Sequence, residues 1–258
     1  MPNYAKAAND ARKKVLEMIF HGGVSHIGSN FSSIDLLTVL FEKTDLNRDK
    51  ILFSKGWVAA SAYYFLSKKG IIPKQDLEKF CDGESPYIGL VEPTIKGIWA
   101  AGGSMSYGLP FGTAFAWDKK NKDEDGNIYI LMSDGEQAMG QNYEAARVAS
   151  HYKLDNLTAI IDYNKLCGMG KTNEILNIEP LSDYWKSLGW DIVEIDGHNY
   201  KEIETALAIR GGGGLNKPYV IIAHTIKGKG ISFMEGNNDW HYRHLDEETY
   251  NKALNELA

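Results

Sequence analysis

Several features that mark particular classes of protein are missing from this sequence. Its only cysteines, Cys81 and Cys167, are far apart, and two distant thiols do not make a disulfide framework, which fits a reducing compartment. No apolar run approaches the ~20 residues that span a bilayer. The N-terminal segment mixes charged with apolar residues and has no apolar signal core. These absences predict a cytoplasmic protein that does not enter a membrane.

The charge balance excludes a further class of protein. The formal net charge is -6, and no run of Lys and Arg provides the concentrated basic face that a nucleic-acid-binding protein usually carries. Nucleic acid is therefore not expected as a partner. With 43% hydrophobic and 24% charged residues over 258 positions, the composition is that of an ordinary globular protein. We expect one domain over residues 1–258, with the glycine run 211–214 as a surface connector.

The sequence does contain a regular alternation of apolar strands and helices. The first part is mainly helical, with a helix cap predicted at Ser32 or Ser33 and a long ordered loop over residues 81–103. From residue 127 on, short apolar strands alternate with helices, which predicts an α/β fold with a mostly parallel central sheet and helices on both faces. The predicted strands are 50–56, 127–132, 157–163, 190–196 and 218–226, and the predicted helices are 1–20, 33–42, 57–70, 107–121, 143–154, 181–189, 200–210 and 245–258.

Polar residues directly follow two of these strands. Asp134 and Gly135 come at the end of strand 127–132, and Asn164 at the end of strand 157–163. The carboxyl ends of parallel strands lie on one edge of a sheet, where open α/β folds bind ligands. Carboxylate and amide oxygens suit Mg²⁺ or Ca²⁺, and a glycine lets a backbone N–H approach a phosphate. The residues alone leave two interpretations open: a metal-bridged diphosphate site, or an Asp-Gly turn with Asn164 as a cap.

The spacing of these residues resembles a known fingerprint. Ser-Asp-Gly, followed after 28 residues by Asn, resembles the motif that binds thiamine diphosphate, and the intervening segment is similar to the transketolase version of it. Other stretches agree with that family in order: SHIGSNFSSIDLLTVLF, SKG, GGSMSYGL, DGHN, HTIKGKGISFME and WHYR. The resemblance covers essentially the whole chain. It implies the thiamine-diphosphate-binding fold, as the diphosphate-binding (PP-type) N-terminal domain of a transketolase.

The resemblance implies a cofactor and its ligands. Thiamine diphosphate is expected together with one divalent cation, Mg²⁺ or Ca²⁺. Asp134, the Asn164 side chain and the Leu166 backbone carbonyl should hold the metal. Gly135 and His241 should approach the diphosphate.

Other motif positions correspond to the rest of the cofactor and to the substrate. By the same resemblance, Gly103 and Met105 border the aminopyrimidine, and His26 and His241 are the catalytic candidates, with His26 facing the substrate. From residue type alone, each histidine is equally compatible with a structural hydrogen bond in a loop. Lys227, in the HTIKGKG segment, would by default be a solvated charge.

The sequence departs from the family pattern on the substrate side. Trp57 follows SKG, and Leu90 lies in GLVEP, where the family has histidines that contact diphosphate or substrate oxygens and assist proton transfer. Neither replacement can exchange protons in that way. Met139 stands where the family has a glutamate at the subunit interface, and Ser106-Tyr107 replaces a typical Gly-Gln. The cofactor anchor is intact, so these changes predict an unusual substrate or weakened catalysis.

The resemblance also implies a second polypeptide. In the family, the glutamate that protonates the aminopyrimidine lies on a pyrimidine-binding domain further along the chain, and this sequence ends at Ala258 after an expected closing helix. We therefore expect a partner chain, the C-terminal transketolase subunit with the pyrimidine domain and the catalytic glutamate, in an α2β2 assembly.

Three functions are compatible with these features. The first is a transketolase-like N-terminal subunit, a transferase that moves a two-carbon ketol unit between sugars or sugar phosphates in a specialised carbohydrate pathway. The second keeps the cofactor but is a 2-oxoacid decarboxylase or dehydrogenase component, or a deoxyxylulose-phosphate synthase type, which would release CO₂ from pyruvate. The third is a degenerate subunit that binds or regulates a partner. The segments KLDNLTAIIDYN and HTIKGKG favour the first.

Overall fold

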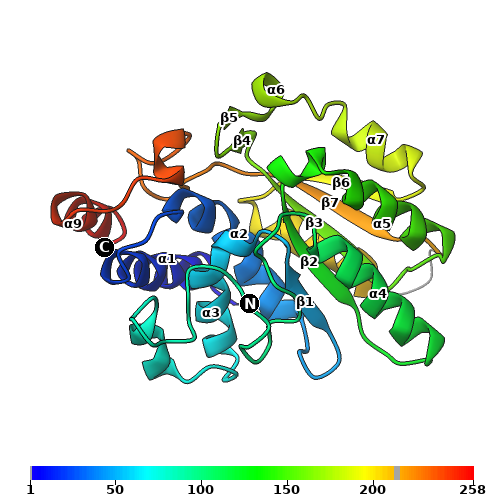
Figure 1. The fold of residues 1–258 in the computed structure, drawn as a ribbon, viewed down its shortest axis with the longest axis horizontal. Coiled ribbons are helices and arrows are strands. Elements are labelled where there is room, and N and C mark those ends of the chain that lie inside the picture. The colour runs from blue at the N-terminus through cyan, green and yellow to red at the C-terminus, as the bar shows by residue number, and fades with distance from the viewer. Residues whose placement is uncertain (1, 212–215) are drawn as a thin grey trace.

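A five-stranded parallel sheet forms the centre of the molecule (Figure 1). The computed structural model describes residues 2–211 and 216–258, so most of the glycine run predicted as a connector lies outside the described residues. The strand order is β1-β2-β3-β7-β6. The strands are β1 (Lys50–Phe53), β2 (Ile128–Ser133), β3 (Leu157–Tyr163), β6 (Asp191–Asp196) and β7 (Tyr219–His224). The predicted parallel sheet is confirmed, with β3 at its predicted bounds.

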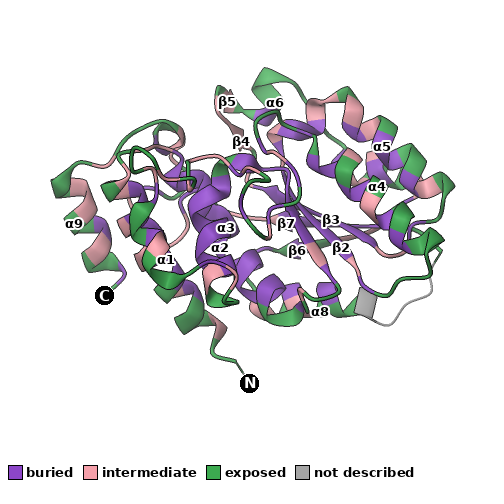
Figure 2. Ribbon diagram, turned by 60° about the horizontal axis from the view of Figure 1, so that its bottom comes forward, coloured by how far each residue is buried: buried purple, intermediate pink, exposed green. Residues whose placement is uncertain are grey.

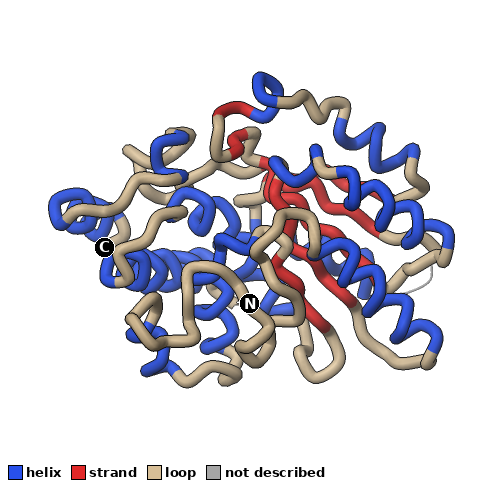
Figure 3. The backbone as a smooth tube through the Cα atoms, viewed as in Figure 1, coloured by secondary structure: helices blue, strands red, loops and turns tan. Residues whose placement is uncertain are grey.

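Helices cover both faces of the sheet, as Figure 3 shows with the strands as one layer between helices. One face packs against α1 (Tyr4–His21), α2 (Ile27–Lys43), α3 (Ala59–Lys68) and α8 (Tyr200–Gly211). The other packs against α4 (Gly108–Asn121), α5 (Gly140–His151) and α7 (Leu181–Ser187). Strand β2 contributes to both cores, because successive side chains point to opposite faces: Tyr129 and Leu131 to the first, Ile130 and Met132 to the second.

Apolar side chains fill both cores, and the strands are buried along most of their length (Figure 2). Each fully buried Leu or Ile contributes about 1.5–3 kcal/mol relative to an exposed one. Short elements complete the fold: the hairpin β4 (Leu166–Cys167) and β5 (Gly170–Lys171), α6 (Thr172–Ile175), α9 (Glu247–Glu256), and the 3-10 turns η1 (Gly56–Val58), η2 (Lys74–Lys79), η3 (Gly135–Ala138) and η4 (Asn238–His241). The sequence did not predict the hairpin or α6, because neither is long enough to show a periodicity.

Helix α2 begins earlier than predicted. Its N-cap is His26, with φ +70, and both predicted caps, Ser32 and Ser33, lie inside the helix. Their hydroxyl groups donate to carbonyls of the preceding turn, at 3.1 Å in each case. The prediction of a serine cap was therefore wrong. Residues 27–41 are buried all round, so tertiary packing, not a local cap, determines where this helix begins.

The predicted long loop over residues 81–103 is confirmed, since it contains no helix or strand. Backbone hydrogen bonds fix it against the loop after β1: Val91 donates to Gly56 at 3.2 Å, and Gly102 donates to Val91 at 2.9 Å. A Cβ on Gly56 would lie 2.3 Å from the Gly102 carbonyl oxygen, so the close approach of the two backbones requires glycine. In the described part of the chain, no helix has the length and apolar character needed to cross a membrane.

Candidate active site

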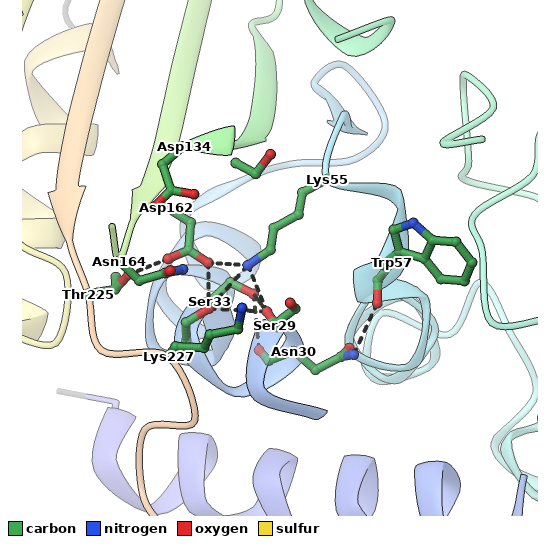
Figure 4. Close-up of polar contacts among 12 residues, drawn as sticks. Ser29, Asn30, Ser33, Lys55, Trp57, Asp134, Asp162, Asn164, Thr225 and Lys227 are labelled. Atoms are coloured by element: carbon green, nitrogen blue, oxygen red, sulfur yellow. Dashed lines mark hydrogen bonds and ion pairs between the residues drawn. The ribbon is translucent and has the colours of Figure 1, made fainter. Parts of the chain in front are cut away.

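The loops after β1, β2, β3 and β7 meet at the carboxyl edge of the sheet. Strands β2 and β3 are neighbours and run parallel, with Ser133 opposite Asp162. Asp134 and Asn164, the residues that follow these strands, therefore leave the sheet at the same edge, as Figure 4 shows. This part of the prediction is confirmed. The local roles are present too, because Asp134 caps η3 and the Asn164 side chain closes a turn onto Leu166.

Asp134 is a buried carboxyl group whose two oxygens both accept from the backbone. Only 2% of its surface is exposed. One oxygen accepts from the Gly135 N–H at 2.7 Å and the other from the Lys165 N–H at 2.5 Å. Burial raises the pKa of Asp134 to about 6, and the nearby Asp162 carboxylate raises it further against the opposing effect of Lys55. A cation placed here would stabilise the ionised form.

The turn after β3 presents two further oxygens on this edge. The Asn164 side-chain oxygen accepts from the Leu166 N–H at 3.1 Å. Between them Lys165 has φ +66, in the left-handed region, so the chain turns sharply into the β4–β5 hairpin. The Leu166 carbonyl lies 3.4 Å from the ammonium nitrogen of Lys227, which places positive charge close to this acceptor.

Lys227 is buried, so the default prediction of a solvated charge was wrong. Only 1% of its surface is exposed, and its ammonium donates to the Asn238 side-chain oxygen at 2.9 Å and to His241 Nδ1 at 2.6 Å. Burial, followed by the charge of Lys55, lowers the pKa of Lys227 to about 8. The loop after β7 folds back over the sheet edge, since the Gly228 N–H donates to the carbonyl of residue 28 at 3.0 Å, and this fold encloses the side chain.

The two candidate catalytic histidines lie together. Their ring centroids are 4.8 Å apart, and the His26 N–H donates to the His241 carbonyl at 3.0 Å. Burial, with the Lys227 charge next, lowers the pKa of His26 to about 4 and that of His241 to about 3. Both rings are therefore neutral at neutral pH. Because the Lys227 ammonium can only donate, His241 accepts at Nδ1 and carries its proton on Nε2.

Trp57 and Leu90, the departures from the family pattern, border this histidine pair. The Trp57 indole stacks on His26 with a centroid distance of 4.3 Å and an interplanar angle of 7°. Leu90 lies beside Gly103, since a Cβ on that glycine would be 3.5 Å from Leu90 Cδ2. A cavity of about 160 Å³ opens next to the stack. It is lined by Ile19, Gly23, Val24, Ser25, His26, Asn30, Trp57, Ala60, Phe80, Gly89 and His244.

The loop predicted to border the aminopyrimidine lies at the surface beside the β2 edge. Gly103 is exposed, and 47% of the Met105 surface is exposed. The Gln141 side chain, from α5, donates to the Met105 carbonyl at 3.1 Å. Met139, at the position of the family's interface glutamate, is the half-buried N-cap of α5.

A buried ion pair supports the site, and sequence reasoning missed it. Asp162, in β3, has no exposed surface and accepts from Lys55, from the Ser32 hydroxyl at 2.7 Å and from the Thr225 hydroxyl (Figure 4). Burial alone would raise the pKa of Asp162, but Lys55 and these hydrogen bonds lower it below its ordinary value. The available signal was a charged residue near the end of an otherwise apolar strand, which has to find a partner.

These residues fit a divalent cation and a diphosphate. A carboxylate, an amide oxygen and a backbone carbonyl form a hard-oxygen donor set of the kind that Mg²⁺ and Ca²⁺ take. The raised pKa of Asp134 shows that its charge is incompletely balanced. Glycine at 135 keeps the approach to its N–H open, because a Cβ there would already be 3.2 Å from the Cys167 side chain. The His241 ring adjoins the same hairpin, 3.2 Å from a Cβ built on Gly168.

A parallel α/β sheet with this edge defines a class of proteins that bind phosphorylated ligands at the ends of their strands. The family described as the thiamine diphosphate binding domain of transketolase matches residues 4–257. The chain belongs to this family.

The similar proteins include two-chain and one-chain transketolases. The chain is 36% identical to the first of the lettered subunits of the apulose-4-phosphate transketolase from Phocaeicola vulgatus, over 96% of this chain and 91% of that protein. It is also 36% identical to a subunit of the 6-deoxy-6-sulfo-D-fructose transketolase from Clostridium sp., over 97% and 94%. The crystal structure of Campylobacter jejuni transketolase superposes with a TM-score of 0.89 at 31% identity, covering 97% of this chain but only 42% of that one.

Proposed function

We propose that this chain is the N-terminal, thiamine-diphosphate-binding subunit of a two-chain transketolase. The transferase would move a two-carbon ketol unit between sugars or sugar phosphates. The observation that carries the proposal is the meeting of Asp134 and Asn164 at one edge of the sheet, in a chain that belongs to the transketolase thiamine diphosphate binding family. Residues 1–258 would form a single domain of this type.

The anchor for the cofactor would come from two loops. Asp134, the Asn164 side chain and the Leu166 carbonyl would hold Mg²⁺ or Ca²⁺, while the Gly135 N–H and His241 would contact the diphosphate. Gly103 and Met105 would border the aminopyrimidine. When bound, thiamine diphosphate supplies an electron sink for breaking and forming the carbon–carbon bond beside a ketone.

The histidine pair would handle the substrate. His26 Nδ1 contacts the Ser25 hydroxyl at 2.7 Å, which leaves Nε2 as the ring nitrogen that a sugar hydroxyl can reach. His241 carries its proton on Nε2 and can donate it in a hydrogen bond. Because both rings are neutral at neutral pH, each can accept or donate a proton without first losing a charge. His26 and His241 are therefore our catalytic candidates.

A partner subunit would complete the active site. The similar proteins named as transketolase subunits have almost the length of this chain, whereas the chain spans 42% of a one-chain transketolase. An apolar surface continues from Met105 along α4 and α5, where Tyr107, Phe111 and Val148 are 44%, 46% and 41% exposed. Contiguous exposed apolar groups of this kind mark protein interfaces. We propose a C-terminal subunit that carries the pyrimidine domain and the catalytic glutamate, in a cytoplasmic α2β2 assembly.

Reconstitution with the partner tests this function. The chain and a candidate C-terminal subunit are purified separately, and ketol transfer between sugar phosphates is measured for each alone and for the mixture, with thiamine diphosphate and Mg²⁺. We expect turnover only in the mixture, and calorimetry should show cofactor binding that requires the metal. Release of CO₂ from pyruvate instead of ketol transfer would replace the proposal with a 2-oxoacid activity. Absence of cofactor binding in every mixture would reject both.

A further inference from the structure

A second carboxyl group is buried two residues after Asp134 and has no part in the proposed anchor. Glu136 has no exposed surface. One of its oxygens accepts from the Ser106 N–H at 2.9 Å and from the Ser54 hydroxyl, and the other accepts from the Ser133 N–H at 2.6 Å and hydroxyl at 3.2 Å. One carboxyl group thus joins three segments: the end of β2, the loop after β1 and the loop before α4.

Each of these contacts supplies a hydrogen-bond donor to the carboxyl group. The backbone N–H groups of Ser106 and Ser133 can only donate. The Ser54 hydroxyl accepts from the Gly108 N–H at 3.2 Å, so its own hydrogen is directed to Glu136. Two acceptor oxygens satisfy all these donors, whereas an amide of the same shape would place an NH₂ group against one of the N–H groups. The arrangement therefore specifies a carboxyl group and not merely a polar side chain.

The loop that Glu136 holds has a backbone that needs support. Ser106 is fully buried and has φ +70, in the left-handed region that favours glycine, which costs about 1–3 kcal/mol for a residue with a side chain. The Gln141 side chain donates to the Ser106 hydroxyl at 2.5 Å. A Cβ on Gly108 would lie 2.3 Å from Ser54 Cβ, so the loop is pressed directly onto the segment after β1. Such a conformation persists only where its surroundings fix it.

We propose that Glu136 is a positioning residue that fixes the loop over residues 102–108 relative to the strand end that carries Asp134. This inference rests on the proposed function: a cofactor anchored by its diphosphate at Asp134 meets its aminopyrimidine neighbours, Gly103 and Met105, only if the two loops keep a constant separation. Glu136 touches neither ligand position. It acts by linking the Ser106 N–H to β2, so that both ends of the cofactor find their contacts already in place.

The test compares Glu136→Gln with Ser54→Ala and with Glu124→Gln, in the full-length chain. Ser54→Ala removes only one donor to the carboxyl group, which keeps the proposal testable should Glu136→Gln fail to fold. Glu124→Gln makes the same chemical change at an exposed residue near the amino end of β2. Amide hydrogen exchange of residues 102–108 is measured without cofactor. The Kd for thiamine diphosphate, and KM against kcat, are measured with Mg²⁺ and the partner subunit.

We expect faster exchange over residues 102–108 in Glu136→Gln and, to a smaller extent, in Ser54→Ala, with Glu124→Gln like the wild type. The Kd should rise about tenfold or more in Glu136→Gln. In Ser54→Ala, KM for the cofactor should rise while kcat at saturation is kept. Unchanged exchange in Glu136→Gln and Ser54→Ala would overturn the proposal, as would faster exchange with an unchanged Kd. If the wild type itself bound no cofactor, the proposed function would fail, while the exchange measurement would still decide whether Glu136 fixes the loop.

Discussion

At the scale of single residues, the site is governed by what covers each titratable group. The Trp57 indole lies flat on His26 although 46% of the Trp57 surface is exposed, so the stack shields the histidine without becoming part of the core. Burial is the largest cause of the lowered His26 pKa. The residue that replaces a family histidine thus tunes the neighbouring histidine instead of exchanging protons itself.

Removing this cover should raise the pKa of His26. In Trp57→Ala we expect the pKa, about 4 in the wild type, to move toward the ordinary value of about 6.5, because water reaches the ring. An NMR titration of the histidine ring signals measures this directly. Trp117→Ala, which removes another exposed indole on α4, should leave the His26 titration unchanged. An unaltered pKa in Trp57→Ala would show that the stack does not control the histidine.

The buried ion pair below the site gives a second residue-scale prediction. Lys55→Met leaves the Asp162 carboxylate without its cation, and Asp162→Asn leaves the ammonium without its anion, so each should lower the free energy of unfolding by about 3–5 kcal/mol. The double variant should lose less than the sum of the two, because neither charge is then buried alone. Urea unfolding measures all three. Lys6→Met, which breaks an exposed pair with Asp10, should cost about 1 kcal/mol or less.

At the scale of elements, one carboxyl group ties α1, α2 and α8 together. Asp35, in α2, accepts from Arg12 of α1 at 2.6 and 3.1 Å, from His198 at 2.8 Å and from Tyr200 of α8 at 2.8 Å. The other His198 nitrogen accepts from the Ile226 N–H at 2.8 Å. The network therefore also holds the loop after β7, which carries Lys227 into the site.

The Asp35 network should make stability depend on pH at the acid end. Burial opposes ionisation, but the hydrogen bond from His198 and the charge of Arg12 lower the pKa of Asp35 to about 2. A lowered folded-state pKa stabilises the protein above the unfolded value of about 4, and this contribution, about 2 kcal/mol, is lost as the pH falls toward 2. Urea unfolding at pH 7, 4 and 3 should show a steeper fall for the wild type than for Asp35→Asn. Equal slopes would contradict the assignment.

At the scale of the whole molecule, the apolar surface on α4 and α5 should determine assembly. Phe111→Glu places a charge in the surface that we propose the partner covers, so it should abolish the complex while leaving the melting temperature of the isolated chain nearly unchanged. Size-exclusion chromatography with light scattering measures the complex. Ile209→Glu, at an equally exposed position on α8, is the matched control and should still assemble. Assembly of Phe111→Glu at wild-type strength would place the interface elsewhere.

The sequence by itself determined the elements, because their signals are local. The apolar runs that became β2, β3 and β7 and the helices between them are readable over a few residues each, and Asp134 and Asn164 stand directly after two such runs. The motif series also identified the family. The serine cap of α2 failed as a prediction, since packing on all sides of that helix overrides the local preference.

Only the tertiary structure decided what surrounds the anchor. Strand β7 lies between β3 and β6 although it follows both in the chain, and this order brings Thr225 to Asp162 and Lys227 to His241. No local pattern encodes such neighbours, because the energy of burying a charge depends on partners that are distant in sequence. The same reason hid the role of Glu136, whose contacts join three segments that meet only once the sheet has formed.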